Sequence, residues 1–384
     1  MTKPERLLSL DVFRGLTMAA MVFVENPGGW PFPRPGSHAA WHQPITPTDW
    51  IFPVFIFIMG VCIPLALTKR KESGASLGKI YLKIFRRTVL LFALGYFLLL
   101  MYDLPDMKLN NIFAILRGVN LPGVLQTIAI VYMFSSLIFL KTSWKTQVWI
   151  VVGFLIAYSL ALNYLPFPGG EPGVFTEGRR RAYTLRDWVD MTVLRMDRGH
   201  AAGILVTLSA VTTGLIGALT GQWLMKENEP TVRTVWLFVA GSLLMIIGGV
   251  WAWWFPIIKD LWTSTYVLYT AGLGIMGVAL CYWVVDVLEY KRWTPPFVAY
   301  GINCISVYFA SHAVATIIGY YIKWETPDGE ISLKGWIIKN IFARGLEHRD
   351  PALLYRHALY SLAIVLFWLI PLYIMYRKKW IIKV

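Results

Sequence analysis

The chain has 384 residues, of which 57% are hydrophobic and 15% charged, and its formal net charge is +14 at pH 7. This apolar content exceeds what a soluble core needs, and apolar runs of about 20 residues recur along the whole length, which excludes an ordinary soluble protein. The runs do not alternate, which also excludes a transmembrane barrel. The composition therefore predicts an all-α polytopic membrane protein.

About ten apolar segments are long enough to cross a bilayer as helices, for which about 20 residues are needed. The sequence predicts spans over residues 8–25, 50–68, 82–101, 122–140, 147–165, 203–224, 234–254, 261–284, 297–320 and 355–376. The first span differs from a secretion signal, because Asp11 and Arg14 interrupt its apolar run and no small-residue cleavage site follows. We therefore expect one transmembrane domain, residues 1–384, built as a bundle of these helices.

Lys and Arg residues gather on one side of the predicted bundle. The segment between the second and third spans carries seven of them: Lys69, Arg70, Lys71, Lys79, Lys83, Arg86 and Arg87. By the positive-inside rule this side faces the cytoplasm, which places both termini there and makes 69–81 an inner basic loop. Residues 26–49, 166–202 and 321–354 become outer loops. The net charge then reflects topology and contact with lipid headgroups, and no motif supports binding of nucleic acid.

Two of the outer loops contain amphipathic stretches. TLRDWVDMTVLRM, residues 184–196, places Leu185, Trp188 and Val193 at spacings that suit a short helix lying at the interface, and SLKGWIIKNIFARGL, residues 332–346, has a similar pattern. These helices would either roof a cavity between the spans or only anchor the loops. We find no convincing internal repeat, which disfavours an inverted-repeat transporter.

Ionisable and amide residues inside spans are rare, so each one is a candidate site residue. Asp11 and Arg14 are three apart and are expected to pair on one helix face, either structurally or around a ligand. Glu25 and Asn26 come at the outer end of the same span, just before a glycine turn. Asn26 would orient a substrate carbonyl or cap its own helix, and the pattern alone favours the cap.

The first outer loop also carries His38, His42 and Asp49. An imidazole works as a base or a nucleophile near neutral pH, and a carboxylate can hold its tautomer. Thr48-Asp49-Trp50 strongly resembles a helix N-cap with an interfacial Trp, which favours a structural role for Asp49, and nothing else in the sequence marks His42 as a site residue. His312, late in the ninth span, would face the same cavity or pack against its neighbours. No HExxH or similar spacing occurs, so we expect no metal.

The inner basic loop has two interpretations. Its charge is explained by topology, and it also suits a phosphate-rich ligand that arrives from the cytoplasm. The sequence has no P-loop, no Gly-x-Ser-x-Gly elbow and no dinucleotide fingerprint. Cys62, Cys281 and Cys304 fall inside predicted spans, so no disulfide is indicated. The residues by themselves indicate a membrane enzyme or a transporter with a His/Asn/Asp site on the outer side.

Six segments resemble one known family. RLLSLDVFRGLTMAAMVFVEN, HAAW and TDWIFPVFIFIMG resemble the catalytic membrane domain of the heparan-α-glucosaminide N-acetyltransferase family, and LPGVLQTIAIVY, DLWTSTYVLYT and YGINCISVYFASHAV resemble its later blocks in the same order. The resemblance implies transfer of acetyl from cytoplasmic acetyl-CoA to the amine of a glucosamine-type sugar on the outer face of a bacterial inner membrane. A homodimer would also fit. RGHAAGIL departs from the family's acidic entry to span six, which leaves the acceptor open.

The resemblance also assigns residues. It implies that His38 is the active-site histidine, as base or as acetyl acceptor, with Asn26 beside it. Supporting or substrate-binding positions would be Asp49, His312, Asp11 and Arg14. We expect the phosphates of CoA to bind Arg14, Lys69, Arg70, Arg86 and Arg87. The roles of His42, His200 and the two long outer loops stay open. The alternatives are a transporter for sugars or cell-wall fragments, and an O-acyltransferase acting on an envelope glycan.

Overall fold

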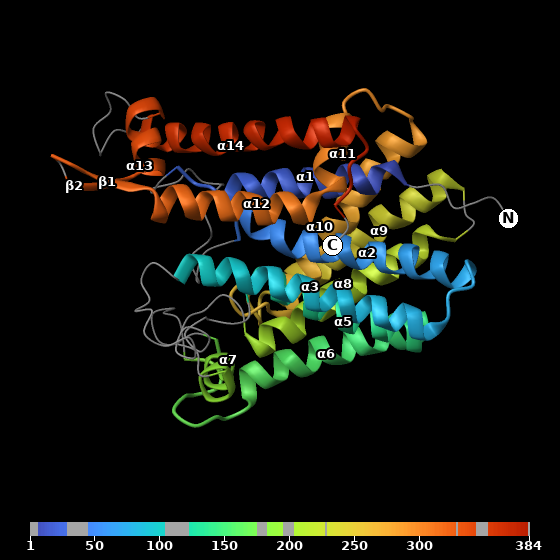
Figure 1. Cartoon of the computed structure of the whole chain (residues 1–384). Coiled ribbons are helices and arrows are strands. Elements are labelled where there is room, and N and C mark those ends of the chain that lie inside the picture. The colour runs from blue at the N-terminus through green and yellow to red at the C-terminus, as the bar shows by residue number, and fades with distance from the viewer. Residues whose placement is uncertain are drawn as a thin grey trace.

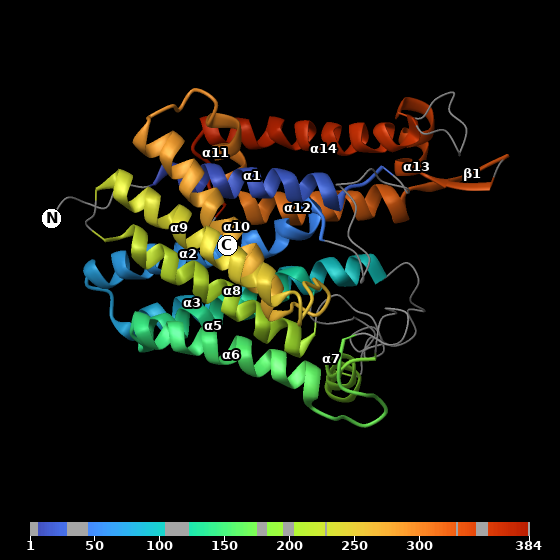
Figure 2. The ribbon, with the colours of Figure 1, turned by 180° about the vertical axis from the view of Figure 1, so that it is seen from behind.

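The structure is a computed structural model that describes residues 7–28, 45–103, 123–174, 183–194, 203–226, 229–327, 329–342 and 352–382. Long helices lie roughly side by side in it (Figures 1 and 2). They are α1 (Leu8–Glu25), α2 (Pro47–Glu72), α3 (Leu77–Asp103), α5 (Val124–Lys141), α6 (Trp144–Tyr164), α8 (Ile204–Leu224), α9 (Pro230–Trp251), α10 (Ser264–Tyr282) and α14 (Ala352–Arg377). A π-helical turn, η4 (Trp283–Val287), extends α10.

One further crossing consists of two helices, α11 (Pro295–Ile302) and α12 (Cys304–Thr316), and ends in a π-helical turn, η5 (Ile317–Tyr321). The sequence predicts a single span over 297–320, but the structure interrupts it at Asn303, which ends α11 and precedes α12. Shorter elements are α7 (Leu185–Val189) with η3 (Asp190–Leu194), the antiparallel hairpin of β1 (Lys323–Thr326) and β2 (Gly329–Ser332), and α13 (Leu333–Ile337) with η6 (Ile338–Phe342). The sequence did not predict the hairpin.

Nine helices within the described ranges are long and apolar enough to cross a membrane. The remaining predicted span is the first, residues 8–25, which forms α1. This helix has 18 residues but carries Asp11, Arg14 and Glu25, and it packs between α10, α11, α2 and α14. The predicted all-α polytopic membrane fold is confirmed. Successive crossings alternate in direction, so that the start of α1 and the end of α14 lie at the same end of the bundle (Figure 1). We call this the basic end, because residues 69–87 also lie there, and the opposite end, with α7, α13 and the hairpin, the loop end.

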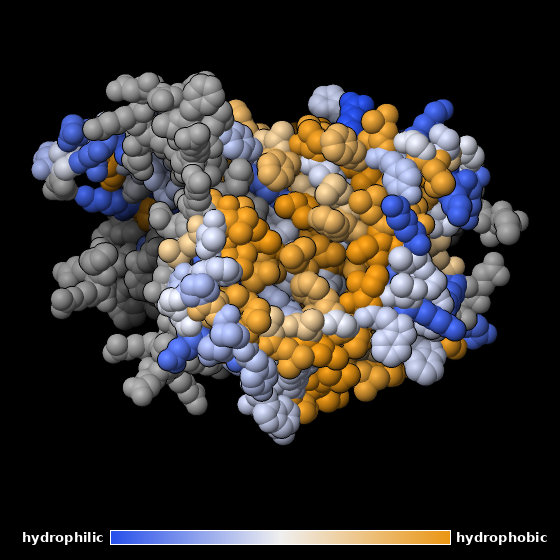
Figure 3. All heavy atoms as spheres, turned by 90° about the horizontal axis from the view of Figure 1, so that it is seen from below, coloured by the Kyte–Doolittle hydropathy of each residue, from blue (hydrophilic) through white to orange (hydrophobic). Residues whose placement is uncertain are grey.

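Burial separates inner helices from outer ones. Of the apolar window of α8, 78% is buried inside the protein, against 17% for α14. The outer helices expose large apolar side chains such as Trp149, Ile246 and Ile370. Figure 3 shows apolar surface gathered across the middle of the bundle and hydrophilic residues toward its two ends. This surface is what a helical bundle presents to lipid.

Glycines let the inner helices approach closely. A Cβ atom on Gly15 of α1 would lie 1.7 Å from the carbonyl oxygen of Phe297 on α11, and one on Gly60 of α2 would lie 2.1 Å from that of Gly214 on α8. Small residues at crossings are the usual means by which membrane helices pack, because lipid supplies no hydrophobic force between them. The positions of α1 and α11 are therefore set by backbone contact.

The first amphipathic stretch begins with a short helix, as predicted, and buries several charged residues. The short helix α7 forms, yet Val193 is 63% exposed, while Arg186, Asp187 and Asp190 are buried. Asp187 closes a capping box with Thr184, and Arg186 Nε lies 2.9 Å from Asp190 Oδ2. Burial of these polar groups is tolerated because each one is paired, and Leu185 from the apolar pattern is buried beside them.

Candidate functional site

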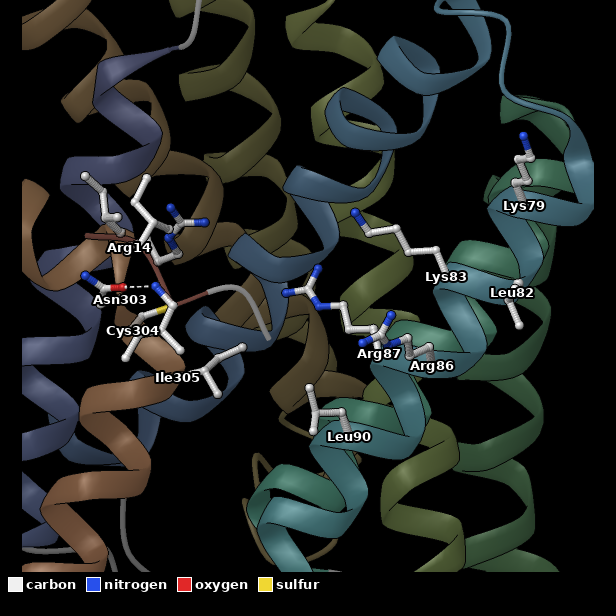
Figure 4. Close-up of a pocket in the computed structure, with 13 residues that line it drawn as sticks. Arg14, Lys79, Leu82, Lys83, Arg86, Arg87, Leu90, Asn303, Cys304 and Ile305 are labelled. Carbon is white, nitrogen blue, oxygen red and sulfur yellow. Dashed lines mark hydrogen bonds between the residues drawn. The ribbon is translucent and has the colours of Figure 1, made fainter. Parts of the chain in front are cut away.

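A cationic cleft of about 620 Å³ opens at the basic end. Lys79, Lys83, Arg86 and Arg87 come from the first turns of α3, where their spacing keeps them near one face of the helix. Figure 4 shows Lys83 and Arg87 reaching from α3 across the gap toward Arg14, Asn303 and Cys304. Several positive charges thus converge on one cavity, and they come from separate parts of the sequence.

Arg14 forms the opposite wall of the cleft. Its Nη2 donates to Asp11 Oδ1 over 2.5 Å, so the predicted pair on α1 forms. The guanidinium of Arg87 lies 4.6 Å from the centre of the Tyr132 ring, in a cation–π contact. Asp11 and Tyr132 therefore hold the two arginines in defined positions at the inner part of the cleft.

A second cavity of about 210 Å³ continues from this point. It shares Arg14, Arg87, Cys304 and Ile305 with the cleft, and its lining follows α2 from Leu67 to Phe55, which is more than three helical turns. Its other lining residues are mainly apolar: Met59, Cys62, Ile63, Ala66, Ile128 and Tyr132. The two cavities together offer a charged mouth and a narrower apolar extension into the bundle.

The cationic residues predicted from the sequence are divided by the fold. Arg14, Arg86 and Arg87 line the cleft, whereas Lys69 and Arg70, which the structure also describes, do not. Both lie in the last turns of α2, and Lys69 is exposed. A charge count along the chain cannot separate these groups, because it does not show which side of each helix faces the bundle.

Asn303 and the C-terminal residues complete the cleft. Asn303 Nδ2 donates to the carbonyl of Trp380 over 3.1 Å, and the amide of Ile382 donates to Asn303 Oδ1 over 2.9 Å. These bonds hold Ile381 and Ile382 against the cavity. Sequence reasoning missed this contact, although an asparagine inside an apolar run was a signal for it.

At the loop end, Asn26 caps its own helix. Its Nδ2 donates to the carbonyl of Val22 over 2.8 Å, and its own carbonyl accepts from Ser361 Oγ of α14 over 2.8 Å. The residue is only 4% exposed. Gly28 packs so closely on α14 that a Cβ there would lie 2.9 Å from the Cα of His357. The end of α1 is thus fixed to α14.

Asp49 lies in a different arrangement at the same end. Its Oδ2 accepts from the backbone amide of Thr46 over 3.0 Å, which makes Thr46 the N-cap of α2 and Asp49 the third helical residue of a capping box. The sequence places the cap at Thr48-Asp49 instead. Asp49 Oδ1 also lies 3.3 Å from Lys259 Nζ, and the carbonyl of Asp49 accepts from Tyr266 over 2.6 Å. Its side chain is therefore already engaged in holding α2.

His312 of α12 faces the end of α1. Its Nε2 lies 3.7 Å from Oε2 of Glu25, and its Nδ1 lies 3.1 Å from the carbonyl oxygen of Tyr308. The Tyr308 ring packs on the imidazole with 4.2 Å between ring centres. The structure therefore brings His312 to the same helix end as Asn26. One indication in the sequence that Glu25 belongs to this group was its position beside Asn26 at the end of a span.

His38, His42 and His200 lie outside the described residues, so their roles stay predictions. The described part of the site has two regions. One is the cationic cleft with its apolar extension at the basic end, and the other is the group formed by Glu25, Asn26 and His312 at the loop end. Such an arrangement can hold an anionic ligand at one end of the bundle and carry out acid–base chemistry at the other.

Comparison with known proteins agrees with the resemblance in the motifs. Residues 6–171 match a family described as a domain of unknown function, DUF5009. The chain is 26% identical to human heparan-alpha-glucosaminide N-acetyltransferase over 433 aligned positions, and 26% identical to the mouse protein of that name over 431. These alignments cover 98% and 97% of this chain, and 59% and 60% of the relatives. The chain thus spans about three fifths of their length, and the predicted similarity is confirmed.

Proposed function

We propose that the chain is a transmembrane acetyltransferase that takes an acetyl group from acetyl-CoA bound at the basic end and passes it to an amine at the loop end. The observation that carries the proposal is the cationic cleft joined to an apolar cavity inside a membrane-spanning bundle. The two similar proteins are named for N-acetyl transfer, which supports the same class of reaction. The basic end then faces the cytoplasm, by the positive-inside rule.

The cleft suits the phosphate-rich part of CoA. Its volume lies within the range of about 300–1,000 Å³ that is usual for ligand pockets. Lysine and arginine both bind phosphates, and arginine can do so through two parallel hydrogen bonds. The neutral pantetheine arm with its thioester would extend into the narrower apolar cavity, past Arg14 and Cys304. We therefore place the phosphate contacts on Lys79, Lys83, Arg86, Arg87 and Arg14, and not on Lys69 and Arg70.

We place acceptance of the acetyl group at the loop end. An amine must lose a proton to attack a thioester, and the oxyanion that forms needs a hydrogen-bond donor. His38 would act as the base or would carry the acetyl group itself before the amine receives it. The acceptor is an amino sugar of the glucosamine type, presented on the outer face of a bacterial inner membrane.

Purified protein tests this directly. With labelled acetyl-CoA and glucosamine, wild type should form N-acetylglucosamine, His38→Ala should not, and His42→Ala, which changes a neighbouring histidine, should keep activity. Mass analysis of the products and of the protein distinguishes transfer through acetyl-His38 from direct transfer. Uptake of sugar into proteoliposomes without acetylation would refute the enzyme and support the transporter.

A matched pair of double variants tests the cleft. Lys83→Gln with Arg87→Gln removes two cations from the cavity wall, and Lys69→Gln with Arg70→Gln removes two from outside it. A hydrogen bond to a charged group contributes about 1.5–3 kcal/mol, so the first variant should weaken acetyl-CoA binding about 100-fold or more. The second should bind as wild type does. Equal effects of the two variants would show that only the overall charge of the basic end matters.

A further inference from the structure

The last residue of α1, Glu25, and its C-cap, Asn26, have side chains with different roles. The amide of Asn26 donates back to Val22 and is buried, so it belongs to the helix cap. The carboxylate of Glu25 is about one third exposed and faces His312 on α12. Of this pair of neighbours, Glu25 presents its charge to the loop end, where an acceptor would arrive.

The surroundings of His312 fix which of its nitrogens can accept a proton. The Tyr308 carbonyl is only an acceptor, so the 3.1 Å contact places the hydrogen of the neutral ring on Nδ1. The unprotonated Nε2 then faces Glu25 Oε2 at 3.7 Å, and the stacked Tyr308 ring limits rotation of the imidazole. The two atoms are farther apart than in a hydrogen bond, so a carboxyl group that has gained a proton donates it to this nitrogen through one bridging water or after a small movement of the side chains. The carboxylate pairs with the ring only after the ring is protonated.

We propose that Glu25 and His312 form a proton relay for the acceptor amine. The Glu25 carboxylate receives the ammonium group of the incoming acceptor, takes one proton from it and passes the proton to Nε2 of His312. This inference rests on the proposed acetyl transfer and adds the substrate requirement that the acceptor arrives as a cation. Glu25 contacts the acceptor, while His312 acts through Glu25 as a positioning and proton-storing residue.

The step balances without any further reactant. The ammonium loses one proton to Glu25 and becomes a neutral amine, whose lone pair forms the new C–N bond to the acetyl carbon. The bond from that carbon to its carrier breaks, and the carrier leaves with the electron pair and takes the second proton of the nitrogen. The proton held by Glu25 and His312 is released to water afterwards. If the carrier is His38, its imidazole keeps the second proton; if the carrier is CoA, His38 acts as the base for the second proton and passes it to the leaving thiolate, so the relay fits both roles of His38.

Two acceptors separate the relay from a structural role. Glucosamine must be deprotonated before it reacts, whereas hydroxylamine is largely neutral at neutral pH. Glu25→Gln should lower kcat/KM for glucosamine about 100-fold or more, the usual scale of general acid–base catalysis, and should leave hydroxylamine acetylation and the KM for acetyl-CoA unchanged. His312→Gln should lower kcat for glucosamine and leave its KM unchanged, since the carboxylate that binds the ammonium is still present.

Two further variants serve as controls. Glu171→Gln removes an exposed carboxylate at the same end of the bundle and should behave as wild type. Glu25→Asp keeps the charge with a shorter arm and should recover part of the glucosamine activity, which keeps the test valid if Glu25→Gln does not fold. Unfolding midpoints of all variants in one detergent establish that folded proteins are being compared.

The outcomes distinguish the two levels of the proposal. If wild type acetylates glucosamine and Glu25→Gln does so equally well, the relay is refuted and the acetyltransferase stands. If Glu25→Gln loses both acceptors to the same extent, the Glu25–His312 pair is structural and the relay is again refuted. If wild type acetylates neither acceptor, the proposed function fails and the relay fails with it.

Discussion

Replacing Gly15 by alanine tests the crossing of α1 and α11. The new Cβ would lie 1.7 Å from the carbonyl oxygen of Phe297 and 2.6 Å from its carbon, and these backbone atoms cannot rotate away. The helices would have to separate by more than an ångström to bring the contact to 3.0 Å. Overpacking of this kind costs about 1–3 kcal/mol, which exceeds the gain of up to about 1 kcal/mol from alanine in a helix.

The same separation should disturb the cleft. Gly301 of α11 lies against the carbonyl of Asp11, so the crossing also positions the Asp11–Arg14 pair. We therefore expect Gly15→Ala to lower the unfolding midpoint of the purified protein and to weaken acetyl-CoA binding. Thermal unfolding in detergent, with and without acetyl-CoA, measures both effects.

Gly153 provides the matched control, because it is an exposed helical glycine of α6, and a Cβ added there would have no atom of the described neighbouring residues within 4 Å. Gly153→Ala should leave stability unchanged or raise it by about 0.5–1 kcal/mol through helix propensity. If Gly15→Ala has the unfolding midpoint and the acetyl-CoA affinity of wild type, the close crossing is absent and the reasoning is refuted.

Three further predictions concern stability. Asp49→Asn removes the charge that pairs with Lys259 and weakens the cap of α2, so the unfolding free energy should fall by about 1–3 kcal/mol, and an unchanged denaturation midpoint would contradict the assignment. Asn303→Ala loses both bonds to the C-terminal residues, so limited trypsin digestion after Lys378 and Lys379 should be faster than in wild type, and an equal rate would contradict it. Burial lowers the pKa of the Lys334 ammonium, so the folded state binds this proton more weakly than the unfolded chain does. The free energy of unfolding therefore rises as the pH increases toward the ordinary lysine pKa of about 10.4. Lys334→Met should therefore be more stable than wild type at pH 7, with the difference closing as the pH approaches that value; a constant difference would refute the role of burial.

The positions of the spans were predictable because they depend on local composition. The first span is predicted over residues 8–25 and α1 covers Leu8–Glu25, and the last is predicted over 355–376 and α14 covers Ala352–Arg377. A run of apolar residues long enough for the bilayer must be helical, whatever its neighbours are. The break at Asn303 was not predicted, since it depends on bonds to residues at the far end of the chain.

The sequence by itself determined the membrane class, the course of the spans and the side on which the cations gather, because each follows from composition within one segment. Only the tertiary structure decided that Lys83 and Arg87 share a cavity with Arg14 while Lys69 does not, and that Glu25 meets His312. These pairings depend on which faces of distant helices meet. Close crossings, such as that of Gly15 of α1 against the backbone of α11, decide which faces meet. They join residues that are far apart in the sequence, so spacing along the chain does not reveal them.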